Sequence, residues 1–127
     1  MTTDIKYFTP TEAQRTLPLV KKIVQDILDN AMEMRLIADE LAGNLDQDSR
    51  IKKLASEIDS FMRELEEIGC FFKDSNFKIG LVDFPSIING EDVLLCWRND
   101  EVEIKYYHNL DSGYSSRKPI PSEYLAE

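Results

Sequence analysis

The stretch Leu81–His108, LVDFPSIINGEDVLLCWRNDEVEIKYYH, decides the fold of this chain. Its strand-forming residues are interrupted by the turn dipeptides Asn89-Gly90 and Asn99-Asp100, a pattern typical of antiparallel strands joined by short turns. We therefore expect a small antiparallel β-meander over residues 70–110.

A two-residue turn at Asn99-Asp100 would set the register of the second hairpin. In that register the facing pairs are Trp97 with Val102, Leu95 with Ile104, and Val93 with Tyr106. The pairs place one wholly apolar face on the hairpin, as burial of one side of a sheet requires. In the strand before it, Val82 and Phe84 share the core face and Asp83 points to the other side, while Pro85 suits a strand edge or end.

The same register separates the reactive side chains. In this register His108 points to the same face as the core residues, whereas Cys96 points to the opposite face. A cysteine–histidine catalytic pair or a shared zinc site needs sulfur and imidazole within a few ångströms of each other. We therefore expect Cys96 and Cys70 to be reduced, packed residues, with no metal and no cofactor. A zinc or iron site through Cys70, Cys96 and His108 is the weaker alternative.

Upstream of the meander, apolar residues recur at alternating spacings of three and four, the seam pattern of a coiled coil. The first run is Leu17, Val20, Val24, Ile27, Ala31, Met34, Ala38 and Leu41, and the second is Ile51, Leu54, Ile58, Phe61, Leu65 and Ile68. The polar break over 43–49 between them predicts an antiparallel, coiled-coil-like helical hairpin over residues 9–69.

The ends of the hairpin carry recognisable signals. Thr9–Glu12 has the residues of a capping box, with a proline at the first helical position. Pro18 predicts a kink or a helix restart, because proline removes a backbone donor and clashes one turn back. Gly69 suits a left-handed cap, after which Cys70 packs back toward Leu65.

The fold class is thus α+β, a long antiparallel helical hairpin followed by a small antiparallel β-meander. With 127 residues the chain is long enough for one domain with its own core. We divide that domain, residues 1–127, into a hairpin over 9–69, a meander over 70–110, and a loop and tail over 111–127. The tail from Lys118 has little periodicity and is expected to be extended or partly disordered.

Composition excludes some functions. The net charge is −9, from 15 basic and 24 acidic side chains, and no cluster of basic residues is present. Binding to nucleic acid or to an anionic membrane surface is therefore not expected. The chain has no apolar run of the roughly 20 residues that a membrane helix needs and no signal-peptide pattern. A cytoplasmic location is expected.

The candidate site residues are few. His108 is the only histidine, and it is either a structural imidazole or part of an anion-binding or acid–base site with Asp111 and Arg117 at one end of the sheet. Trp97 beside Arg98 is either core or a partner-binding anchor. The full set of candidate ligand- or partner-binding residues is Asp83, Trp97, Arg98, His108, Asp111 and Arg117.

Apolar residues flank both seams, and a hairpin of two helices cannot bury so wide a stripe alone. They are Ile23, Leu28, Ile37, Ala55 and Met62. Either the sheet or a second copy of the chain covers them. We therefore interpret the protein as a non-enzymatic, self-associating interaction module, a homodimer through the hairpin that also presents a surface to a protein partner. The alternative is a small enzyme or anionic-ligand binder that uses His108, Asp111 and Arg117.

The chain also resembles a prokaryotic family known as domain of unknown function 2203. The residues that carry the resemblance are Phe8–Ala13, Leu17–Leu19, Gly69-Cys70, Lys73-Asp74, Gly80–Pro85, Gly90, Val93, Leu95–Arg98, Tyr107-His108, Gly113 and Arg117. Two positions depart from it, since Tyr107 stands where a tryptophan is expected and Asn99-Asp100 replaces a glycine-containing turn. The resemblance implies a helical hairpin followed by a β region, and it implies no activity.

Overall fold

The computed structural model describes residues 5–41 and 48–125. Most of the polar loop expected over 43–49 therefore lies outside the described residues, as do the last residues of the tail, 126–127. The helices and strands are α1 (Pro10–Leu41), α2 (Ser49–Ile68), β1 (Phe71–Phe72), β2 (Leu81–Ile88), β3 (Glu91–Arg98), β4 (Tyr106–Asn109), the 3-10 turn η2 (Tyr114–Ser116), β5 (Lys118–Pro119) and the 3-10 turn η3 (Ser122–Tyr124).

The two helices form the predicted hairpin. At the start of α1 the Thr9 amide donates to Glu12 Oε1 at 2.9 Å and the Glu12 amide donates to Thr9 Oγ1 at 3.1 Å, which confirms the capping box. Pro18 lies inside one continuous helix, so no restart occurs there. Gly69 ends α2 with a φ of 112°, and the Cys70 amide donates to the Leu65 carbonyl at 3.0 Å, as expected.

The strands form one antiparallel sheet in the order β1-β2-β3-β4-β5. Asn89 and Gly90 both have positive φ values, 53° and 79°, and join β2 to β3 in a two-residue turn. This turn sets a register in which Asp83 faces Cys96 directly. Pro85 lies within β2 rather than at its end. It comes after Asp83, the last residue of β2 that pairs with β1.

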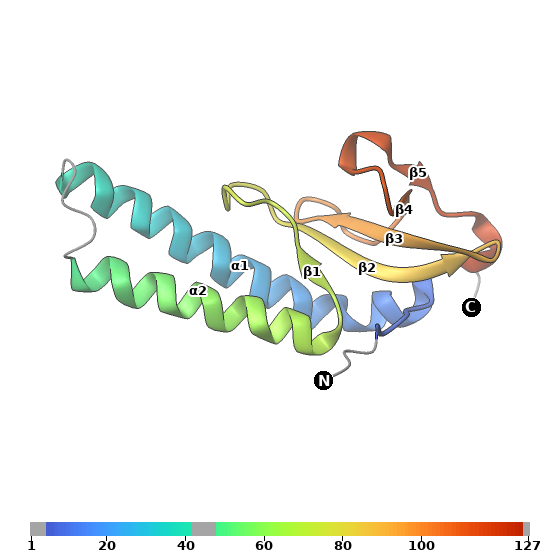
Figure 1. Cartoon of the computed structure of the whole chain (residues 1–127), viewed down its shortest axis with the longest axis horizontal. Helices are drawn as coiled ribbons and strands as arrows, with labels where there is room; N and C mark the ends of the chain where they lie inside the picture. The colour runs from blue at the N-terminus through green and yellow to red at the C-terminus, as the bar shows by residue number, and fades with distance from the viewer. Residues whose placement is uncertain (1–4, 42–47, 126–127) are drawn as a thin grey trace.

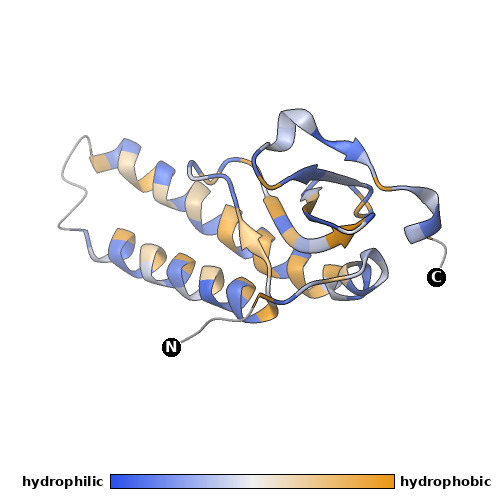
Figure 2. Cartoon of the chain, turned by 45° about the vertical axis from the view of Figure 1, so that its right-hand side comes forward, coloured by the Kyte–Doolittle hydropathy of each residue, from blue (hydrophilic) through white to orange (hydrophobic). Residues whose placement is uncertain are grey.

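The helices cover one face of the sheet, and the loop between β4 and β5 lies on the other side (Figure 1). The apolar side of the helices faces the sheet (Figure 2). Val82, Phe84, Leu95 and Trp97 are buried in one core with α1, which confirms the predicted core face of β2 and β3. The far ends of both helices project beyond the sheet (Figure 1). Within the described residues neither helix has an apolar stretch that could cross a membrane.

The predicted register of the second hairpin is wrong. The observed pairs are Leu94 with His108, Leu95 with Tyr107, and Cys96 with Tyr106. The second strand is therefore shifted by three residues relative to a tight Asn99-Asp100 hairpin. An odd shift exchanges the two faces of a strand. His108 consequently shares a face with Cys96.

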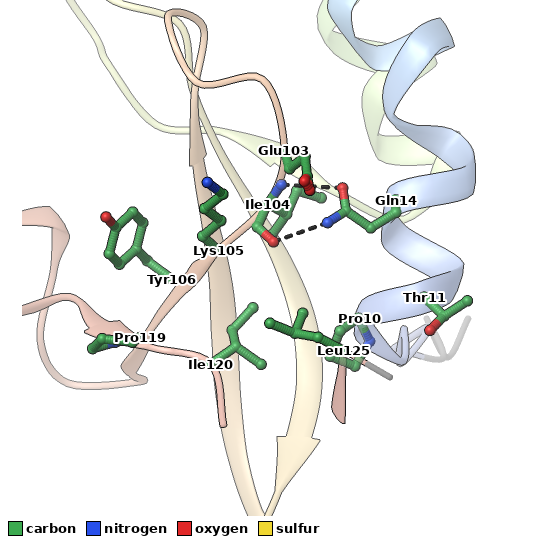
Figure 3. A pocket seen from close by; sticks show the side chains of 10 residues that line it. All are labelled: Pro10, Thr11, Gln14, Glu103, Ile104, Lys105, Tyr106, Pro119, Ile120 and Leu125. Carbon is green, nitrogen blue, oxygen red and sulfur yellow. Dashed lines mark hydrogen bonds between the residues drawn. The ribbon is translucent and has the colours of Figure 1, made fainter. Parts of the chain in front are cut away.

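The shift has a tertiary cause in the segment between the turn and β4. The turn itself forms, since the Glu101 amide donates to the Arg98 carbonyl at 2.9 Å. Beyond it, Gln14 of α1 binds both backbone groups of Ile104, each at 3.0 Å (Figure 3). Lys21 Nζ donates to the Val102 carbonyl at 3.0 Å. These side chains draw residues 101–105 toward α1, so the segment does not pair with β3.

The C-terminal tail begins with an extended strand, β5, and is folded as far as Leu125 rather than partly disordered. Tyr106 and Tyr107 of β4 pair with Pro119 and Lys118 of β5. Ile120 is buried, and its amide donates to the Lys105 carbonyl at 2.9 Å. The tail therefore adds the last strand of the sheet, which local periodicity did not reveal.

Candidate functional site

Three neighbouring strands place one reactive side chain each on the sheet face away from the helices. Asp83 comes from β2, Cys96 from β3 and His108 from β4. Their ligand atoms, a carboxylate oxygen, the thiol sulfur and an imidazole nitrogen, all lie within 4.8 Å of one another. Asp83 faces Cys96 directly, and His108 faces Leu94, two residues from Cys96 on the same side of β3. The structure thus joins Cys96 and His108, which the sequence-based register had separated.

The cluster is buried, with 2% of Asp83, 2% of Cys96 and 3% of His108 exposed. Burial raises the pKa of Asp83, an effect partly offset by the neighbouring His108 and Lys73. Burial and the nearby Asp83 carboxylate raise the pKa of Cys96 to about 12. Uncompensated charges are costly in such surroundings. Burial therefore works against the charged forms of both Asp83 and Cys96.

The backbone determines which nitrogen of His108 is available. Nδ1 lies 2.8 Å from the carbonyl oxygen of Asn109, which can only accept, so Nδ1 carries a proton. Nε2 lies 3.3 Å from Asp83 Oδ1. In metal sites a histidine often donates its Nδ1–H to a backbone carbonyl and binds the metal through Nε2. His108 has this arrangement, because its Nε2 faces the other potential metal ligands.

The donor types and the distance between His108 and Asp83 fit a zinc-like ion. Zinc binds cysteine sulfur, histidine nitrogen and aspartate oxygen. Its bonds to nitrogen and oxygen are about 2.0–2.1 Å long, so two such ligands of a tetrahedral ion lie about 3.3–3.4 Å apart. The separation of His108 Nε2 and Asp83 Oδ1 is 3.3 Å. The set meets the requirement for a transition-metal site with mixed ligands.

The geometry does not fit a cysteine protease-like triad. In such a triad the acidic residue and the cysteine use different nitrogens of the imidazole. Here Asp83 faces Nε2, and the Asn109 carbonyl occupies Nδ1. No nitrogen is left for Cys96 alone. The raised pKa of Cys96 also disfavours the thiolate that a nucleophile needs.

A cavity of about 230 Å³ opens beside the cluster. Its wall includes all members of the cluster, and the remaining lining residues are Lys73, Leu81, Leu94, Leu110, Ser112, Gly113 and Tyr114. A larger cavity of about 330 Å³ lies between the start of α1 and the C-terminal segment (Figure 3). That cavity has no part in the cluster, so the smaller one is the candidate site.

Arg117 holds the loop that covers this cavity. Its guanidinium lies 4.3 Å from the ring centre of Tyr106 and 4.2 Å from that of Tyr114, and it forms an ion pair of 2.9 Å with Glu101. Arg98 in turn donates to the Tyr114 hydroxyl. Tyr114, which lines the cavity, is thereby fixed by both arginines.

The other predicted residues have different positions. Trp97 is buried in the core, and its Nε1 donates to the Glu101 carbonyl at 2.8 Å. Arg98 pairs with Asp100 at the hairpin tip. Asp111 is exposed and lines neither the candidate cavity nor the cluster. Of the predicted residues, Asp83 and His108 come together at the site, and Arg117 supports its wall.

Sequence reasoning missed Lys73 and Tyr114 as site residues, and it considered Cys96 only in the weaker metal-site alternative. A signal for Cys96 existed, since an Asn89-Gly90 turn places Asp83 opposite Cys96 by counting outward from the turn. Counting outward from the Asn99-Asp100 turn does not place His108, because residues 101–105 after this turn do not pair with β3.

No curated protein and no solved structure matches this chain significantly. The sequence model of a family described as an uncharacterized conserved protein, DUF2203, matches residues 6–120. This match covers the hairpin, the whole sheet and each member of the buried cluster. The chain therefore belongs to the DUF2203 family.

Proposed function

We propose that this protein binds one divalent transition-metal ion, zinc in the first place, through Asp83, Cys96 and His108. The observation that carries the proposal is the convergence of a carboxylate, a thiol and an imidazole within 4.8 Å in a buried position. A bound cation would neutralise the two acidic groups and accept the lone pair of Nε2. It would thus remove the cost of burying these groups together.

The number of protein ligands favours a working site over a structural one. Structural zinc sites are closed by four protein ligands, whereas catalytic sites use three and leave a position for water or substrate. The cluster supplies one atom from each of Asp83, Cys96 and His108 and adjoins a cavity. The chemistry that such an ion supplies is Lewis-acid activation of an oxygen-containing ligand.

Calorimetric titration of the full chain with Zn²⁺ and Co²⁺, together with elemental analysis, tests the proposal. We expect one ion per chain and, for Co²⁺, a sulfur-to-metal charge-transfer band. Cys96→Ala should abolish the band and weaken metal binding by at least about tenfold. Even replacing a residue that only hydrogen-bonds to a metal ligand usually lowers metal affinity by about that much. Cys70→Ala is the matched control, since Cys70 is equally buried but lies outside the cluster. Equal affinity of both variants would refute the assignment.

We also infer self-association through the hairpin, but from other residues than the sequence suggested, because Ile23 and Ile37 are buried within the single chain. Met32 and Leu36 are 54% and 58% exposed on α1. They are one turn apart and therefore neighbours on one face of the helix. They lie in the second half of α1, and the far end of this helix projects beyond the sheet (Figure 1). A second copy covering this face would bury both side chains.

Light scattering coupled to size exclusion tests self-association. The expected result is a dimer that the double variant Met32→Lys/Leu36→Lys converts to a monomer. Leu19→Lys is the control, because Leu19 is 56% exposed on the same helix but outside the proposed face. A monomeric wild-type chain at micromolar concentration would exclude the dimer and leave the metal proposal untouched.

A further inference from the structure

We propose that the open coordination position of the metal accepts a small carboxylate-type oxyanion, and that Lys73 attracts it. The inference rests on the proposed metal function and names the class of ligand that this site would take. It concerns the cavity beside Asp83, Cys96 and His108, not the surface of the hairpin.

The first argument is size. The cavity measures about 230 Å³, below the roughly 300–1,000 Å³ of pockets that hold drug-sized ligands. Its apolar walls, Leu81, Leu94 and Leu110, come from β2, β3 and the segment after β4. The space therefore fits a ligand of a few heavy atoms with one polar end.

The second argument is local charge. A divalent ion bound by an aspartate, a thiolate and a neutral imidazole has no net charge left, because the two anionic ligands balance the ion. Lys73 then adds one positive charge at the cavity wall. Its charge already acts on Asp83, and its backbone is fixed to β2, with the Lys73 amide donating to the Leu81 carbonyl at 2.9 Å. The loaded site is thus cationic although the chain carries a net charge of −9.

The third argument is that the other nearby cations are already paired. Arg98 is bound to Asp100, and Arg117 is bound to Glu101. Among the described residues Lys73 has no carboxylate within ion-pair distance. Its ammonium group is therefore free to bind an anion whose oxygen occupies the metal.

Carboxylate and bicarbonate meet these requirements, because one oxygen can bind the metal while the other faces Lys73. Both oxygens bear charge, which distinguishes this class from neutral ligands of the same size. Oxygen ligands of this kind bind zinc readily.

The experiment uses the full chain loaded with Co²⁺, whose visible absorption reports changes in coordination. Acetate and bicarbonate are titrated separately, and acetamide is the neutral probe of matched size. We expect saturable spectral changes with one or both anions and none with acetamide. The preferred anion indicates whether the natural ligand is an organic acid or bicarbonate.

Lys73→Met should weaken anion binding by about two- to fivefold, the range for one partly exposed charge pair, without changing Co²⁺ affinity. Lys78→Met is the control, because Lys78 lies in the same segment but does not line the cavity. An unchanged spectrum with both anions, or equal anion affinity in Lys73→Met, would overturn the inference while leaving metal binding intact. Failure of Co²⁺ to bind would instead refute the metal proposal and the inference with it.

Discussion

His108 Nε2 and Asp83 Oδ1 lie 3.3 Å apart although their strands, β4 and β2, are not neighbours in the sheet. Strand β3 runs between them, and adjacent strands are about 4.8 Å apart. The two side chains therefore reach toward each other across the middle strand, over the position of Cys96. The contact between Asp83 and His108 therefore depends on both the register of β2 with β3 and the register of β3 with β4.

Metal binding should stabilise the fold, because the ligands come from three strands and the unfolded chain does not hold them together. At a free Zn²⁺ concentration of 100 times Kd, the free energy of unfolding should rise by about 2.7 kcal/mol. Urea denaturation with and without Zn²⁺ measures this rise.

His108→Ala should lose most of the stabilisation by Zn²⁺ while remaining folded in its absence. A variant at Asp111, such as Asp111→Ala, serves as the control, since this exposed residue lies outside the cluster. Stabilisation of equal size in His108→Ala would show that zinc binds elsewhere.

Much of the fold was predictable because its signals are local. The capping residues Thr9 and Glu12, the αL glycine Gly69 and the Asn89-Gly90 turn each act within a few residues of themselves. The seams of the two helices likewise repeat over short distances. Such signals are readable from one sequence without knowledge of tertiary contacts.

The site was not predictable for a physical reason. We attribute the register of β4 to Gln14, which is 90 residues from Ile104 in sequence. A tight hairpin after Arg98 was a sound local expectation, and the turn does form. The helix then competes with β3 for the backbone of Ile104, and the helix prevails. No local pattern contains this competition.

Replacing Gly80 should destabilise the protein. A Cβ atom at this position would lie 2.5 Å from Val24 Cγ1 and 2.8 Å from Asn99 Cβ, closer than real contacts allow. Gly80→Ala should therefore cost about 1–3 kcal/mol, the usual range for overpacking a core. The urea midpoint of unfolding measures the loss. Gly113→Ala is the control, because nothing lies within 4 Å of its added Cβ; equal midpoints for the two variants would contradict the packing argument.

Asp74 should stabilise the segment before β2 in a pH-dependent way. Burial raises its pKa, but bonds from the amides of Ile79, Lys78 and Asn76 outweigh this effect and lower the pKa overall. Because the pKa of Asp74 is lowered in the folded state, its contribution to the free energy of unfolding is complete above the unfolded pKa of about 3.9. This contribution disappears as the pH falls through the folded-state pKa.

Asp74→Asn should therefore destabilise the chain at pH ~7 and much less at pH ~2. Urea midpoints of both proteins at the two pH values give the answer, and a difference that does not shrink in acid would exclude the charged carboxylate as the cause.

Gln14 should control the site from a distance. Its amide makes two hydrogen bonds of 3.0 Å with the backbone of Ile104 and so keeps residues 101–105 away from β3 (Figure 3). Gln14→Leu preserves the apolar part of the side chain but leaves both backbone groups without their partner, which costs about 1–3 kcal/mol for each buried group. Since His108 follows this segment, the variant should also bind Zn²⁺ more weakly although Gln14 touches no ligand. Gln25→Leu is the matched control, because Gln25 on the same helix donates to Asp29 at the surface and not to the backbone of another segment among the described residues. Calorimetry and urea denaturation of both variants test the two effects. Loss of stability in Gln14→Leu with unchanged Zn²⁺ affinity would show that the register of β4 is set by the strand pairing itself and not by the helix.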